Sequence, residues 1–217
     1  MITGCVYKDR DRRFVLKTEQ SGVMKPFPYS IWLVPCAEQR AELARSIELL
    51  AARFGTIPFA PHATLCSGTW GQGLPALIET VDRMAAQFSS QRLNVEGMSW
   101  SDRWFGFFFL RLRCEMNLFA RACGLVEGSH SPDIGPHVSL LYRFNAEGVD
   151  RNALREGLMG VIPSVIRFDA LELVRPSTGR WEDVAGWESL HTVSLAARNQ
   201  PDDHGMGRAS NPRKHSL

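Results

Sequence analysis

The sequence predicts an α+β sandwich built from two similar halves related by a pseudo-twofold axis, which would bring two of its strands together across a cleft. One observation behind this is a pentapeptide that occurs twice, as Pro61-His62-Ala63-Thr64-Leu65 and, 75 positions later, as Pro136-His137-Val138-Ser139-Leu140. Another is the alternating order of strand-like and helix-like segments along the chain. The third is an ordinary composition, with 44% hydrophobic residues among 217, which suffices for a substantial core.

The first half of the chain alternates strand and helix patterns. An apolar, β-rich run over 29–34 predicts a strand, and apolar residues at three- and four-residue spacing over 38–54 predict an amphipathic helix. The first motif predicts a strand over 61–66, which a glycine-rich loop follows. Pro75 suits the first turn of a helix, so a helix is expected over 75–88.

The second half repeats this pattern. We expect, in order, strands over 92–100 and 104–112 joined by a turn at Ser101-Asp102, a helix over 117–126, the second motif strand after a turn-rich loop over 128–135, a helix over 147–159, and strands over 165–174 and 187–195. The domain is therefore expected to span 28–196. Residues 1–27 form an unassigned N-terminal extension, and the polar composition of 197–217 predicts a disordered tail.

The two-residue period of a β-strand predicts which side chains of the repeated motif share a face. Successive side chains point to opposite faces, so His62 and Thr64 share one face, and the aliphatic residues between and after them share the other. The same alternation groups His137 with Ser139. A twofold relation between the halves would therefore bring two imidazoles and two hydroxyls together across the cleft.

The distribution of charge limits the kind of ligand. The net charge of +2 comes from the two ends of the chain, because residues 28–196 contain 15 Arg, no Lys and 18 Asp or Glu. An acidic body is poorly suited to a long polyanion, so a small substrate is favoured over extended nucleic acid. The absence of lysine also excludes a Walker A loop and a nucleophilic lysine from this region.

Cellular context is predicted from the cysteines and from the hydropathy. Five cysteines, an odd number without a C-x-x-C pair, suit a reducing cytoplasm better than a disulfide framework. The charged N-terminus lacks the apolar segment of a signal peptide, and no apolar run is long enough to span a membrane. We therefore expect a cytoplasmic protein without membrane contact, and a monomer.

The paired H-x-T/S strands make the chain resemble the 2H phosphoesterases, and within them the cyclic nucleotide phosphodiesterases of the plant and yeast type. The resemblance covers most of 28–196. Beyond the motifs it includes Tyr29-Ser30-Ile31-Trp32, the aromatic strand over 104–112, Ser139-Leu140-Leu141-Tyr142 and the closing Trp187-Glu188. It implies the bilobal LigT-like fold, with two antiparallel sheets lining a central cleft and helices outside. It also implies hydrolysis of nucleoside 2′,3′-cyclic phosphates, or of ADP-ribose 1″,2″-cyclic phosphate, to phosphomonoesters.

The resemblance assigns a role to each motif side chain. One of His62 and His137 activates water and the other protonates the leaving oxygen, while Thr64 and Ser139 donate hydrogen bonds to the phosphate oxygens. Sequence leaves the division of the two roles open, with His137 as base and His62 as acid the preferred order. Trp32 and Tyr142 resemble the substrate-binding aromatic residues of the family, although packing in the core is an equal alternative.

The same residues leave other functions open. A metal site is disfavoured, because two histidines without a neighbouring cysteine or carboxylate motif fall short of the usual three or four ligands, and no cofactor is expected. The first alternative is a nucleotide-binding 2H module without turnover. The second is processing of RNA ends that carry cyclic phosphates, or 2′–5′ RNA ligation, which would make RNA ends a partner.

Overall fold

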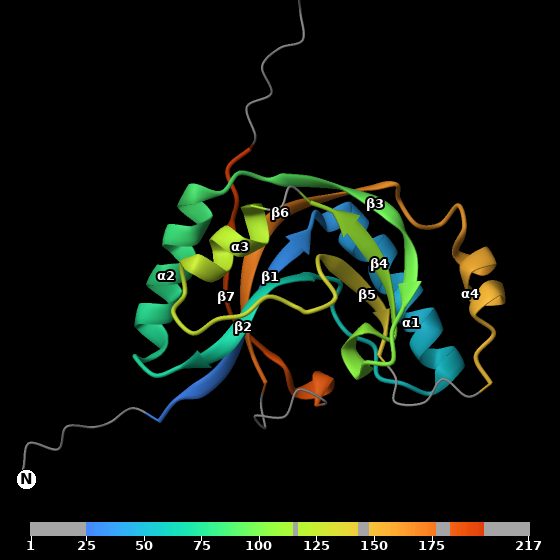
Figure 1. Cartoon of the computed structure of the whole chain (residues 1–217), viewed down its shortest axis with the longest axis horizontal. Helices are drawn as coiled ribbons and strands as arrows, with labels where there is room; N and C mark the ends of the chain where they lie inside the picture. The colour runs from blue at the N-terminus through green and yellow to red at the C-terminus, as the bar shows by residue number, and fades with distance from the viewer. Residues whose placement is uncertain (1–24, 115–116, 143–147, 177–182, 198–217) are drawn as a thin grey trace, which may run out of the picture.

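The computed structural model describes residues 25–114, 117–142, 148–176 and 183–197 (Figure 1). Most of the predicted extensions, residues 1–24 and 198–217, lie outside the described residues, so their nature stays a prediction. The first half of the domain contains β1 (Phe27–Pro35), α1 (Ala37–Phe54), β2 (Ala63–Trp70), α2 (Leu74–Gln87) and β3 (Gln91–Trp100). The second half contains the 3-10 turn η1 (Trp104–Gly106), β4 (Phe108–Arg113), α3 (Asn117–Gly124), β5 (His137–Leu141), α4 (Arg151–Leu158), β6 (Val165–Arg175), the 3-10 turn η2 (Val184–Gly186) and β7 (Glu188–Ser194).

The order of the strands shows the twofold relation directly. The sheet runs β2-β1-β6-β3-β4-β5, and β7 pairs with β6. When β1 is exchanged with β4, β2 with β5 and β3 with β6, the result is the same strand order read from the opposite end of the sheet. The central β3–β6 pair, in which Leu93 faces Ile166, therefore lies on the pseudo-axis. The α+β class and the two related halves are confirmed.

The two expected sheets are the two ends of one continuous antiparallel sheet. Strand β6 joins them because one of its edges is shared: Val165 to Phe168 pair with β3, whereas Ala170 to Arg175 pair with β7. Its other edge pairs with β1. The strands of the two halves are thus interleaved: β6 of the second half pairs with β1 of the first, and β3 of the first half pairs with β4 of the second.

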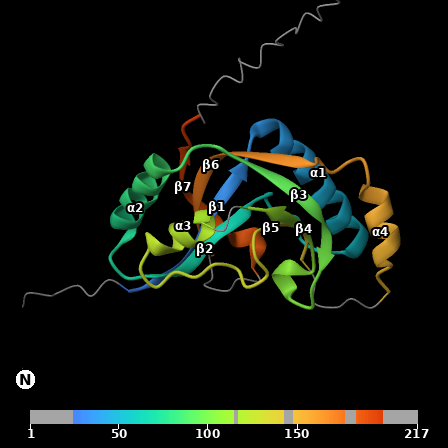
Figure 2. The same ribbon diagram turned by 45° about the horizontal axis from the view of Figure 1, so that its top comes forward.

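The helices tie the two halves together. Helix α1 packs against β5 of the second half as well as against β1, and α3 packs against β2 of the first half. Strands β2 and β5 stand at opposite ends of the strand order, yet they contact each other, so the sheet curls until its two motif strands meet. Figures 1 and 2 show α2 and α3 at one end of the molecule and α1 and α4 at the other.

The predicted alternation of the motif strands is confirmed on the core side. The aliphatic residues of both pentapeptides, Ala63, Leu65, Val138 and Leu140, are fully buried. Strand β2 continues into the predicted glycine-rich loop as far as Trp70, because Gly68 leaves room for the buried Tyr29 ring on β1. A Cβ at Gly68 would lie 2.9 Å from the Tyr29 hydroxyl oxygen.

Two further elements begin several residues later than the sequence predicts. The strand expected over 104–112 begins only at Phe108, because residues 104–106 form η1, which is fixed where the Ser101 hydroxyl donates to the Gly106 carbonyl oxygen at 2.6 Å. The helix expected over 147–159 begins at Arg151, because the Asp150 carboxylate caps it by accepting from two backbone N–H groups. Within the described segments, no helix combines the length and the apolar character that crossing a bilayer requires.

Candidate active site

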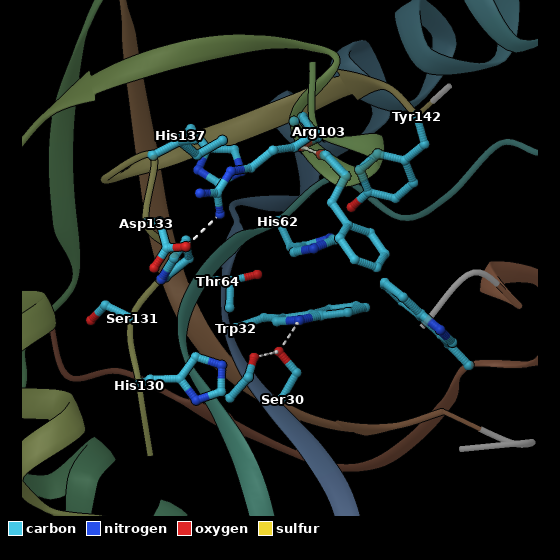
Figure 3. Close-up of a pocket in the computed structure, with 17 residues that line it drawn as sticks. Ser30, Trp32, His62, Thr64, Arg103, His130, Ser131, Asp133, His137 and Tyr142 are labelled. Carbon is cyan, nitrogen blue, oxygen red and sulfur yellow. Dashed lines mark hydrogen bonds and ion pairs between the residues drawn. The ribbon is translucent and has the colours of Figure 1, made fainter. Parts of the chain in front are cut away.

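A cavity of about 340 Å³ lies where the two motif strands meet, a size in the range of small-molecule sites. All four motif side chains that sequence singles out line it, as do both predicted aromatic residues. The complete lining is Ser30, Trp32, His62, Thr64, Ser67, Arg103, Phe105, Gly106, His130, Ser131, Pro132, Asp133, Ile134, His137, Ser139, Tyr142 and Trp187. Figure 3 shows His62 and Thr64 from one half and His137 from the other around the same space.

The two imidazoles are held in the same way. Nδ1 of His62 lies 2.6 Å from the carbonyl oxygen of Ala60, and Nδ1 of His137 lies 2.8 Å from that of Gly135. A carbonyl oxygen only accepts, so each Nδ1 carries the proton and each Nε2 is left for proton transfer. Gly135 adopts φ +75°, a left-handed conformation that glycine tolerates at little cost, in the turn that presents its carbonyl to His137.

Aromatic rings hold the two histidines at equivalent positions of the two halves. The Trp32 ring stacks on His62 with centroids 3.6 Å apart and planes at 10°, and Phe109 meets His137 edge-on at 5.3 Å. Trp32 pairs with Thr64 across β1 and β2, just as Phe109 pairs with Ser139 across β4 and β5. The pseudo-symmetry therefore extends to the residues that support the imidazoles.

Burial makes the electrostatics of the two histidines unequal. Burial of the His62 ring, which is 6% exposed, lowers its pKa to about 3. The hydrogen bond to Ala60 opposes this shift, whereas the charges of His137 and Arg40 add to it. Burial also lowers the pKa of His137, to a smaller extent, against the opposing effect of Gly135. Without a ligand both imidazoles are therefore neutral at pH 7, and His137 has the higher proton affinity.

The two hydroxyls of the motifs are placed differently. The Thr64 side chain is half-buried and lines the cavity. Ser139 is 4% exposed, and its hydroxyl donates to the carbonyl oxygen of Phe105 at 2.6 Å. Ser139 thus fixes the residues around η1 over the cavity, and a hydrogen bond also joins its side chain to Tyr142. A donor role toward a ligand requires Ser139 to release Phe105.

Trp32 and Tyr142 line the cavity, but a neighbouring ring covers one face of each. Trp32 stacks on His62 and donates its Nε1–H to the Ser30 hydroxyl at 2.8 Å. Tyr142 stacks on Phe59 with centroids 3.7 Å apart. Both are 4% exposed. These contacts give each ring a packing role beside the predicted substrate contact, which stays a prediction.

Several lining residues were not singled out by sequence as ligand contacts. Phe105 and Trp187 reach the cavity from the segments around η1 and η2, and Trp187 lies 5.4 Å from Trp32 between ring centroids. Arg103 and Asp133 form an ion pair on two loops of the rim. Arg103 and Asp133 lie on loops, where no strand or helix period predicts the direction of a side chain. Among the described residues, no group of three or more His, Cys, Asp or Glu side chains is arranged to hold a metal ion.

Comparisons with known proteins give structural neighbours only. No protein-family model and no curated protein matches the sequence. The chain is similar to the crystal structure of E. coli LigT complexed with NADP+, with a TM-score of 0.49 and 16% identity over 79% of this chain and 99% of that one. It is also similar to the crystal structure of a phosphoesterase, with a TM-score of 0.46 and 17% identity over 78% of this chain and 99% of that one. The structure of Kluyveromyces marxianus Usb1 has a TM-score of 0.38 and 12% identity over 78% of this chain and 97% of that one. These scores lie below 0.5, so the function rests on the geometry of the site.

Proposed function

We propose that this protein hydrolyses cyclic phosphodiesters, nucleoside 2′,3′-cyclic phosphates in the first place, by acid–base catalysis between His62 and His137 without a metal ion. The observation that carries the proposal is the matched pair of imidazoles. Each donates Nδ1–H to a backbone carbonyl two residues earlier, and each lines the same small cavity. Among the described residues, neither Nε2 atom has a hydrogen-bond partner in the protein, so both are available for proton transfer.

The reaction needs one proton acceptor and one proton donor. One neutral imidazole takes a proton from water as the water oxygen attacks phosphorus. The bond from phosphorus to one ribose oxygen breaks, and the other histidine, as an imidazolium, gives its proton to that ribose oxygen. The product is a phosphomonoester. Exchange of protons with solvent returns the pair to its starting state.

The electrostatics favour His62 as base and His137 as acid, the reverse of the order preferred from sequence. His137 has the higher proton affinity, so it takes up the first proton when a phosphate anion enters the cavity. His62, stacked on Trp32 and more deeply buried, then remains neutral and accepts the proton of water. Thr64 is placed to donate to a non-bridging oxygen.

The direct test is turnover of 2′,3′-cyclic AMP in the presence of EDTA, with the products identified by chromatography. The proposal expects hydrolysis to a phosphomonoester, and a loss of roughly 10²–10⁴-fold when His62→Ala or His137→Ala removes a general acid or base. His191→Ala is the matched control, because His191 pairs with Asp82 away from the cavity. A variant without either motif histidine that keeps most activity contradicts the mechanism.

The same assay separates the alternatives. Tight binding of the cyclic nucleotide without hydrolysis would indicate a nucleotide-binding module. Much faster opening of oligonucleotides that end in a cyclic phosphate would indicate processing of RNA ends, and joining of such ends to 5′-hydroxyl RNA would indicate ligation. The excess of acidic over basic residues in 28–196 speaks against an extended RNA groove.

A further inference from the structure

The lining of the cavity contains one cation and one anion that carry full charge at neutral pH, Arg103 and Asp133. The two form an ion pair, and the Arg103 guanidinium lowers the pKa of the Asp133 carboxyl. They come from different loops, Arg103 from the connection between β3 and β4 and Asp133 from the loop before β5. Figure 3 shows the Arg103 side chain extending past His137 toward Asp133.

This ion pair lies at the rim of the cavity and is more exposed than the buried His62 and the half-buried His137. The side chains of Arg103 and Asp133 are 61% and 68% exposed, whereas His62 is 6% exposed. A phosphate placed for reaction between the imidazoles occupies the buried end of the cavity. An anion that meets Arg103 at the rim is therefore a different group of the same ligand.

Replacing Asp133 by another anion as the partner of Arg103 costs little free energy. An exposed ion pair contributes little to stability, because water and salt screen both charges. A guanidinium binds two oxygens of a phosphate side by side, and a phosphate monoester carries more negative charge than a carboxylate. A ligand phosphate at the rim can thus replace Asp133 with a net gain.

We propose that Arg103 binds a second phosphate of the substrate, one that is not opened in the reaction, and that Asp133 holds the guanidinium in place until this phosphate arrives. The inference rests on the proposed function and narrows it. The preferred substrate is a cyclic phosphodiester that carries a further phosphate, such as a nucleoside 2′,3′-cyclic phosphate with a 5′-phosphate. Residues 28–196 contain no lysine that could take this role.

The test compares two stable ligands by titration calorimetry, adenosine 2′-phosphate and adenosine 2′,5′-bisphosphate, which differ only in the second phosphate. We expect the wild-type protein to bind the bisphosphate about 10-fold more tightly, the lower end of a charge-assisted contact. Arg103→Ala should abolish this difference, Arg103→Lys should keep part of it, and Asp133→Asn should enlarge it by freeing the guanidinium.

Arg113→Ala is the matched control, since Arg113 is an exposed arginine paired with Glu96 at 3.7 Å outside the cavity lining. It should preserve the wild-type difference. Equal affinity of the wild-type protein for the two ligands, or a bisphosphate preference that survives in Arg103→Ala, overturns the role of Arg103 while the proposed function stands. If neither ligand binds, the site is not a nucleotide site and both proposals fail.

Discussion

Acidification from pH 7 to pH 5 should destabilise the folded protein through one buried side chain, His62. Its pKa is lowered to about 3 in the folded state, mainly by burial, and returns to about 6.5 when the chain unfolds. The unfolded state therefore binds the extra proton between these values. The stability that depends on a neutral His62 is fully present above the pKa of the unfolded state and is lost as the pH falls below that pKa.

The size of the effect follows from the two pKa values. At pH 5 the unfolded His62 is almost fully protonated and the folded His62 almost fully neutral, so linkage costs about 2 kcal/mol relative to pH 7. This figure changes little as long as the folded pKa lies at least a unit below 5. Shifts of a few kcal/mol are a sizeable part of the stability of a typical domain.

The measurement is urea unfolding at both pH values for the wild-type protein and for His62→Gln, which cannot titrate. The wild-type protein should lose about 2 kcal/mol more than His62→Gln between pH 7 and pH 5. Comparing the pH dependence, rather than the stability itself, removes the cost of the lost Trp32 stacking. His130→Gln, at an exposed histidine of the same cavity, should follow the wild-type curve. Equal losses in wild-type and His62→Gln would refute the burial of a neutral His62.

Three further predictions follow from packing. Trp32→Phe should keep more activity than Trp32→Ala, and only the alanine variant should shift the pH–rate profile, because its cavity admits water beside His62. Gly68→Ala should destabilise the fold by about 1–3 kcal/mol in urea unfolding, because the new Cβ meets the Tyr29 hydroxyl. Adding Tyr29→Phe to this variant should recover part of the lost stability. No recovery would mean that the strain lies elsewhere. Leu65→Ala should cost about 2–5 kcal/mol, as expected at a fully buried leucine, and a smaller change by the same assay would mean that the site collapses around it.

The motif strands were predictable because a strand has a fixed period and the same five-residue pattern occurs twice. Thr64 and Leu65 necessarily point to opposite faces once the segment is extended, and the repeat implies a twofold relation. The junction between the halves was not predictable, because it depends on Leu93 meeting Ile166 across a pair of strands far apart in the chain. Local sequence carries little information about such pairing.

The cavity was predictable at its buried end and not at its rim. His137 and its hydroxyl partner follow from the motif, but the hydrogen bond from Ser139 to Phe105 depends on how the segment around η1 folds back over β5. Arg103 comes directly after the predicted turn at Ser101-Asp102, where sequence indicates a turn but not the direction of its side chains. Irregular segments have no period from which orientation can be read.

The crossed packing of α1 on β5 and of α3 on β2 has a consequence for folding. Each half lends a helix to cover the motif strand of the other, as two subunits do when they exchange an element. Neither half should hold its own core when separated, whereas two fragments divided in the loop between β3 and β4 should reassemble when mixed. The single chain thus resembles a dimer whose subunits have exchanged elements and are covalently joined. Its proposed catalytic centre forms only when both halves are folded together.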